Sequence, residues 1–347
     1  MRSWPLSFIL VPALSAAAAE RKFDFSQFPL NEAPPGFRSA VTGQGKPGDW
    51  KIIMDEGGSS SAERASPTKQ AVLAQLAEDP TDEHFPLLIF EDESYGDFTL
   101  TTRFKTVRGA QEQMAGIAFR IQNETNYYIA RASSKGSTFR FYKVIDGQRG
   151  EMHGPEIPIS SGVWHQMMIE AKGNRFRCEL DGKEVIPLLT DNSPFNIGKI
   201  GFWTKSDSVS YFADTTLVYT PRESPLQPVL RDLSKKYPRL LALKVYVAAS
   251  APGTTRMVAS KDEQDIGQAG GKTEKEVISR AETYYGKEND IVSVIMPLRD
   301  RNGDAIAAVR IVTKFFRGQT EQNAIVRATP IVQALQARVQ SLADVTQ

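Results

Sequence analysis

Arginine and aromatic residues on short alternating segments are the side chains of this sequence best suited to recognising a polar, ring-shaped ligand. Aromatic rings contact the apolar faces of sugar rings, and guanidinium groups hydrogen-bond to hydroxyl groups. The candidate ligand-binding residues are Arg120, Tyr127, Tyr128, Arg131, Arg140, Trp164 and Trp203. In the alternative interpretation, the tryptophans fill a core and the arginines lie along a sheet with their charged ends in water. We assign no catalytic residue.

Carboxylates give weaker support for catalysis. On a strand, Glu91 and Glu93 would share one face at roughly 6–7 Å, which is two residue rises. Glycoside hydrolases use carboxyl pairs separated by about 5–9.5 Å. The run from Glu93 to Asp97, however, is typical of an acidic turn. We therefore expect a solvated turn at this place.

Metal ligands are sparse in the sequence. The three histidines are scattered, and the single cysteine, Cys178, shares strand parity with Phe176 and Leu180. This spacing predicts a buried thiol and gives a zinc site no support. The residues themselves predict no cofactor.

The elements that must position these residues are strands. From Asp97 to Tyr219, segments with alternating apolar residues are separated by Gly, Asn, Asp or Ser at short, regular intervals. This pattern is typical of an antiparallel sandwich or barrel. In GIAFRI (116–121), alternation places Ile117, Phe119 and Ile121 toward the core and leaves Arg120 on the other face. In TFRFYK (138–143), Arg140 and Tyr142 share a face opposite the phenylalanines.

This region resembles the concanavalin A-like lectin/glucanase superfamily, and within it the laminin G-like and 3-keto-disaccharide hydrolase-like domains. The resemblance is carried by GIAFRIQNETNYYIAR (116–131), GVWHQMMIEAKGNRFRCELDGKEV (162–185) and KIGFWTKSDSVSYFADTTLVY (199–219). It implies a jelly-roll β-sandwich over residues 20–219. Some laminin G-like domains carry a calcium site, and the resemblance implies that Asp181 and Asp214 could contribute to one here. The same fold carries both ligand-binding proteins and hydrolases, so it does not decide between them.

After Tyr219 the sequence changes character. Residues 220–228 contain three prolines and form the expected linker. Residues 229–347 are expected to be an α+β domain, with a helix opened by the capping box Thr273–Glu276 and running to about Gly286, a hairpin at Asn302-Gly303 and a last helix over 321–341. MVASKDEQDIGQ and MPLRDRNGDAIAAVRIV resemble a PAS/Cache-like sensory domain, which implies binding of a small metabolite between sheet and helix. The predicted fold class is therefore mainly β, a sandwich followed by a smaller α+β domain.

The N-terminus predicts export. Residues 1–19 combine one positive charge, a short apolar run and a small-residue end, which is typical of a signal peptide. We expect a periplasmic or secreted protein with no transmembrane segment once this peptide is removed. The net charge of the whole chain is +1, so general attraction to nucleic acid is not expected.

Three functions remain open at this point. The first is an exported protein whose sandwich binds a carbohydrate or a small organic ligand and whose C-terminal domain binds a metabolite or a partner. The second is an enzyme acting on glycosidic bonds, of the 3-keto-disaccharide hydrolase kind, with Glu91, Glu93 and Glu170 as its candidate acids. The third is a non-catalytic envelope module that binds a protein partner.

Overall fold

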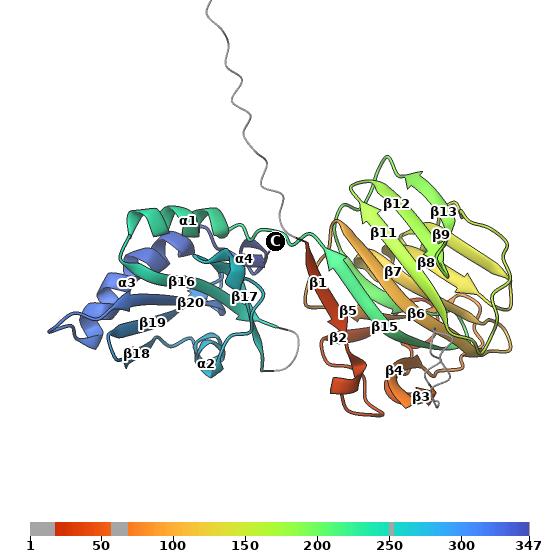
Figure 1. The fold of residues 1–347 in the computed structure, drawn as a ribbon, viewed down its shortest axis with the longest axis horizontal. Helices are drawn as coiled ribbons and strands as arrows, with labels where there is room; N and C mark the ends of the chain where they lie inside the picture. The colour runs from red at the N-terminus through yellow and green to blue at the C-terminus, as the bar shows by residue number, and fades with distance from the viewer. Residues whose placement is uncertain (1–17, 57–68, 250–252, 347) are drawn as a thin grey trace, which may run out of the picture. The chain divides into compact units, whose positions relative to one another are not determined.

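The computed structural model describes residues 18–56, 69–249 and 253–346. The chain divides into two compact units, the first built mainly from residues up to Pro221 and the second from Arg222 onward. Strands make up most of the first unit (Figure 1), and the predicted mainly β sandwich is confirmed. Most of the predicted signal peptide lies outside the described residues. No helix in the described ranges is long and apolar enough to cross a membrane.

The first sheet is antiparallel and has one buried face. Its order is β13-β12-β11-β6-β15-β4-β3, with β1 paired to β15. The strands are β1 (Ala19–Phe23), β3 (Trp50–Glu56), β4 (Lys69–Gln75), β6 (Phe98–Arg108), β11 (His165–Lys172), β12 (Arg175–Leu180), β13 (Lys183–Thr190) and β15 (Val209–Tyr219). On β6, buried residues alternate with partly exposed ones, starting with buried Phe98. This is the alternation expected of a sheet with one face toward the core.

The second sheet is buried on both faces. Its order is β10-β9-β8-β7-β14-β5-β2. The strands are β2 (Phe37–Gly43), β5 (His84–Phe90), β7 (Met114–Asn123), β8 (Asn126–Ser133), β9 (Thr138–Ile145), β10 (Gln148–Arg149) and β14 (Lys199–Trp203). Every residue of β5 is buried, as are the first eight of β7. One face packs on the first sheet, and the other carries an apolar cluster of its own.

Aromatic rings join the two sheets. Phe119 and Tyr128 of the second sheet stack with ring centroids 5.5 Å apart, and Phe176 of the first sheet lies 4.7 Å from Tyr128. All three side chains are at most 1% exposed. Burial of one such side chain contributes roughly 1.5–3 kcal/mol. The packing of the sandwich is therefore set by these large rings.

A bulge on β7 reverses part of the predicted alternation. Arg120 has φ +47°, and the β7–β8 register shifts after Phe119. Ile121, opposite Lys199, therefore joins the cluster of Ala118 instead of the core side of Phe119. The expectation that Arg120 lies on the free face is wrong, because the extra residue turns its side chain inward.

Gly198 makes this bulge possible. A Cβ atom placed on Gly198 would lie 2.3 Å from the backbone carbonyl carbon of Arg120. We expect Gly198→Ala to lower the free energy of unfolding by about 2 kcal/mol, because the backbone must move apart. Urea unfolding followed by tryptophan fluorescence measures this change. Gly96→Ala is the control, since its Cβ would meet its nearest neighbour at 3.5 Å, and equal loss in both variants would contradict the expectation.

The second unit is a five-stranded antiparallel sheet with helices on both faces. Its order is β17-β16-β20-β19-β18. Its elements are α1 (Gln227–Lys236), β16 (Leu240–Ala248), β17 (Thr255–Ser260), α2 (Lys272–Arg280), β18 (Tyr284–Glu288), β19 (Ile291–Arg299), β20 (Ala305–Lys314), α3 (Glu321–Gln336) and α4 (Ala343–Thr346). Residues of α1 and α3 share one core with the sheet, whereas Val277 of α2 packs on Ile295 and Ala308 on the opposite face. The PAS/Cache-like identity of this unit stays a prediction.

Two predicted helices of this unit end earlier than expected, and the last one, α3, ends at Gln336 instead of residue 341. Helix α2 begins at Lys272 with Gly271 as its N-cap, and it ends at Arg280. It cannot reach Gly286, because Gly286 lies in β18 and pairs with Ser293 of β19. The hairpin at Asn302-Gly303 is confirmed, since β19 and β20 pair directly across it.

Candidate functional site

The second sheet curves around the face that carries its own apolar cluster, and we call this the concave face. The hydroxyl oxygens of Thr42 on β2 and Tyr127 on β8 lie 3.1 Å apart. Three strands separate β2 from β8 in the sheet, which would be about 19 Å across a flat sheet. Only a strongly curved sheet brings these two side chains into contact.

One row of cross-strand neighbours on the concave face carries three predicted residues. Trp203 lies opposite Gly116, Gly116 opposite Arg131, and Arg131 opposite Arg140. Cross-strand neighbours point to the same face of a sheet. The shared face of Arg140 and Tyr142 is confirmed by this row and the next, in which Tyr142 lies opposite Ile129.

Aromatic side chains fill the floor of the concave face. Tyr127 and Trp203 are each 1% exposed, and Tyr142 is 3% exposed. The ring of Phe85 stacks on Trp203 with centroids 5.7 Å apart. These rings are packed against one another and offer little surface to a sugar. The aromatic side chains therefore form a packed base for the site, and the side chains open to a ligand are the polar groups beyond Trp203.

A buried lysine begins the polar cluster at this end. Lys205 follows Trp203, the last residue of β14, by two residues. The backbone N–H groups of Thr204 and Ser206 on either side of it donate to β5, so the alternation continues and brings Lys205 to the same face. Its Nζ atom lies 2.6 Å from Asp82 Oδ1 and 3.0 Å from Glu112 Oε1, and its side chain is 9% exposed. Burial lowers the pKa of Lys205, but the bonds to Asp82 and Glu112 outweigh burial and raise it overall. Lys205 is therefore a fixed cation with two carboxylate partners.

Arg131 and Tyr142 extend the cluster. Arg131 Nη1 donates a hydrogen bond to Thr138 Oγ1 at 2.7 Å. Burial raises the pKa of the Tyr142 hydroxyl, and the nearby charges of Arg131, Arg149 and Lys205 oppose this rise without cancelling it. Tyr142 therefore stays a neutral hydrogen-bond donor among cations. We call Asp82, Glu112, Arg131, Tyr142 and Lys205 the concave-face cluster.

The remaining predicted residues lie elsewhere in the sandwich. Arg120 is fully buried and bonds to backbone carbonyl groups at one end of the core. The Tyr128 hydroxyl donates to Asp191 Oδ2 at 2.5 Å between the sheets. Trp164 lies under Arg103 and Lys105, which project from the outer face of the first sheet. The structure therefore brings Tyr127, Arg131, Arg140 and Trp203 together and separates the other three.

The candidate acid Glu170 and the candidate calcium ligands Asp181 and Asp214 each lie beside a basic side chain. Glu170 lies beside Lys172 and Arg177 on the first sheet. Asp181 Oδ2 lies 2.8 Å from His165 Nδ1, and Asp214 pairs with Arg103 at 2.9 Å. Within the described residues, no group of three or more His, Cys, Asp or Glu side chains could hold a metal ion. Calcium binding stays a prediction.

The residues that the sequence did not single out are Asp82, Glu112, Tyr142 and Lys205. Tyr142 and Lys205 could have been found by extending the alternation from Arg140 and from Trp203. Asp82 and Glu112 lie in loops before β5 and β7. Nothing in their local sequence indicates that both carboxylates meet one lysine more than 90 residues later.

Comparisons with known proteins cover the sandwich region. Residues 39–214 match the family described as the 3-keto-alpha-glucoside-1,2-lyase-like domain. No curated protein matches this chain. Among solved structures, the carbohydrate-binding module CBM66 from Bacillus subtilis is 19% identical, with a TM-score of 0.36, over 48% of this chain and 94% of that one. A putative glycosyl hydrolase from Parabacteroides distasonis is 18% identical, with a TM-score of 0.32, over 42% of this chain and 85% of that one.

Proposed function

Because the chain belongs to the 3-keto-alpha-glucoside-1,2-lyase-like family, we propose that its sandwich unit binds a saccharide at the concave-face cluster. The observation that carries this proposal is that four polar side chains converge beside the buried aromatic rings of the concave face. They are Glu112, Arg131, Tyr142 and Lys205. Carboxylates accept hydrogen bonds from sugar hydroxyls, and guanidinium, ammonium and phenol groups donate to them. The cluster therefore offers both kinds of partner that a hydroxyl needs.

Partial burial strengthens the hydrogen bonds that these polar groups could make to a ligand. The side chains of Lys205 and Glu112 are 9% and 21% exposed, so they are already shielded from water before a ligand binds. Hydrogen bonds to charged groups are stronger in such surroundings than in open solvent. The proposed recognition rests on these bonds instead of the ring stacking expected from the sequence, because Trp203 and Tyr127 are covered.

Binding of sugars by the full-length chain tests the proposal. We expect a glycan array to identify a ligand, and calorimetry to show binding about tenfold or more weaker in Glu112→Gln, since the variant loses a charged acceptor. Arg177→Gln is the control, because Arg177 pairs with Glu170 on the first sheet. Failure to bind any glycan, or equal affinity of the unchanged chain and Glu112→Gln, would contradict the proposal.

A 1,2-lyase reaction is a second candidate, favoured by the contact of a carboxylate with a cation. In a 3-keto-glucoside the ketone acidifies the hydrogen at C2. Glu112 would take this proton, the C–H electron pair would form the C1=C2 double bond, and the C1–O bond would break. The departing alkoxide would take up a proton from water. Lys205 and Arg131 would stabilise the negative charge that develops on the ketone oxygen.

Turnover separates binding from lyase activity. A 3-keto-α-glucoside incubated with the chain would give an unsaturated ketone, which absorbs ultraviolet light, and the rate would fall in Glu112→Gln by about a hundredfold or more. Tight glycan binding without this product would leave the saccharide-binding role and remove the lyase. The predicted acid Glu170 lies on the first sheet beside Lys172 and Arg177, so Glu170→Gln is expected to leave both readouts unchanged.

We also propose that the chain is exported and works in the periplasm or outside the cell, with its C-terminal unit as an accessory sensory-type domain. Residues 1–19 support export by their composition. Fractionation of cells that express the full-length chain, with N-terminal sequencing of the product, tests this proposal. An uncleaved chain found only in the cytoplasm would contradict it.

A further inference from the structure

The second unit holds a pocket of about 850 Å³ between its sheet and α3. Its floor is apolar and is made by Leu240, Val294, Ile311, Ala324, Ala328 and Ile331. This volume falls within the range of about 300–1,000 Å³ that is typical of small-molecule sites. The unit lies outside the family match at residues 39–214, so the pocket does not depend on the saccharide proposal.

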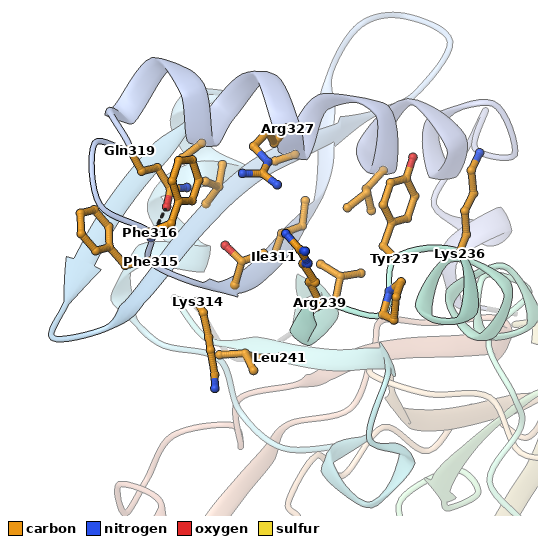
Figure 2. Close-up of a pocket in the computed structure, with 17 residues that line it drawn as sticks. Lys236, Tyr237, Arg239, Leu241, Ile311, Lys314, Phe315, Phe316, Gln319 and Arg327 are labelled. Carbon is orange, nitrogen blue, oxygen red and sulfur yellow. Dashed lines mark hydrogen bonds between the residues drawn. The ribbon is translucent and has the colours of Figure 1, made fainter.

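The charged residues of the pocket are all cations. Lys236, Arg239, Lys314 and Arg327 line it, and none of its lining residues is Asp or Glu. Figure 2 shows the guanidinium group of Arg239 rising from the segment before β16 and that of Arg327 beneath α3, both facing the same space. Two guanidinium groups in one pocket repel each other. An anion between them would convert this repulsion into attraction.

Neither arginine has a carboxylate partner in the part of the chain that the structure describes. Arg327 lies over the ring of Phe316, with its Cζ atom 4.9 Å from the ring centroid. Stacking of this kind orients a guanidinium group and leaves its N–H edge free for a planar anion. Arginine binds carboxylates through two parallel hydrogen bonds, which suits a pair of such groups above an apolar floor.

We propose that this pocket binds an amphipathic anion, a carboxylate carried on an apolar chain or ring. The carboxylate would lie between Arg239 and Arg327, with Lys236 and Lys314 adding positive potential at the ends of the pocket. The apolar body would lie against Phe316, which is 42% exposed, over the buried side chains of Ile311, Ala328 and Ile331. Burial of its surface supplies the rest of the affinity.

Calorimetry on the full-length chain with octanoate tests this site. We expect saturable binding of octanoate, and much weaker binding of octanol, which lacks the charge, and of acetate, which lacks the apolar body. Arg239→Gln and Arg327→Gln should each weaken octanoate binding about tenfold, because each removes a charged hydrogen-bond donor. Lys272→Gln is the control, since Lys272 belongs to α2 on the other face of the sheet and its side chain is 86% exposed.

Several outcomes would overturn the site. Equal binding of octanol and octanoate would remove the role of the arginines, and unchanged affinity in both arginine variants would do the same. Binding to phosphatidylglycerol vesicles without binding of free octanoate would indicate a lipid surface in place of a small-molecule pocket.

Both arginines are exposed, so the variants are expected to fold, and circular dichroism checks this. If one does not fold, the comparison of octanoate, octanol and acetate on the unchanged chain still decides.

Discussion

Replacing Arg120 with methionine is expected to lower the free energy of unfolding of the sandwich unit by about 4 kcal/mol. The Arg120 side chain is fully buried, and Nη1 donates to the carbonyl oxygens of Gly173 and Phe195 at 2.7 and 2.8 Å. Nη2 and Nε both donate to Gly96. One guanidinium group therefore ties together three loops, and its loss leaves three carbonyl groups without their donor.

The arrangement of several N–H donors on the planar guanidinium group is as important as its charge. Lysine has a single ammonium group that cannot reach three carbonyls in different directions. We therefore expect Arg120→Lys to recover little of the stability lost in Arg120→Met. Burial lowers the pKa of Arg120 and the charge of Asp97 opposes this, but arginine keeps its proton at any ordinary pH. The instability should be the same from neutral to mildly acidic solution.

Tryptophan fluorescence measures the unfolding of the sandwich unit separately from that of the second unit. All four tryptophans precede residue 220, so a urea transition followed by fluorescence reports on the sandwich and not on the second unit. Arg108→Met is the control, because Arg108 and Glu78 form an ion pair in which both side chains are more than half exposed. Such a pair contributes about 0–1 kcal/mol. Equal stability loss in Arg108→Met and Arg120→Met would contradict the proposed role of Arg120 in holding the three loops together.

Sequence alternation predicted the sandwich where its strands are regular. On β12, Cys178 is buried with Phe176 and Leu180, as the spacing of two predicts. Burial also raises the pKa of the Cys178 thiol, which agrees with its assignment as an inert apolar residue. Periodicity is a local property, so it needs no knowledge of the rest of the chain. It holds as long as no residue is inserted into a strand.

Alternation failed at Arg120 because the cause of the bulge lies far away. The extra residue is accommodated opposite Gly198, which is distant in sequence and reaches β7 only when the sheet forms. Likewise, the sequence placed Tyr127 and Trp203 as ligand-binding candidates, but it could not show that the curvature of the sheet covers them. Their burial depends on Phe85 and Thr42 from β5 and β2. Such long-range contacts decide whether a face is open.

Asp207 is the second residue whose removal should have a large effect, and it links stability to the candidate site. Its carboxylate accepts hydrogen bonds from the backbone N–H groups of Ala110, Gln111 and Glu112, at 2.5 to 3.1 Å. These bonds fix the loop that carries Glu112 to Lys205. We expect Asp207→Ala to lower the free energy of unfolding by about 3 kcal/mol, roughly 1 kcal/mol for each N–H group left without its acceptor.

The effect depends on pH in a defined direction. Burial raises the pKa of Asp207, but the backbone N–H groups outweigh burial and lower it overall. A carboxyl group whose pKa is lower in the folded state stabilises the fold above its unfolded pKa of about 3.9, and this contribution is lost as the pH falls through the folded value. The difference in stability between the unchanged chain and Asp207→Ala should therefore be largest near neutral pH and shrink below about pH 4.

Unfolding curves across this pH range, followed by fluorescence, measure the difference. Asp49→Ala is the control, because Asp49 pairs with Lys51 in a partly exposed contact and should matter little at any pH. A stability difference that stays constant with pH would mean that the charge of Asp207 is not what holds the loop. If the loop does position Glu112, the same variant must also bind its saccharide more weakly at neutral pH, where the fold is still intact. Unchanged affinity there would separate Asp207 from the site and confine it to stability.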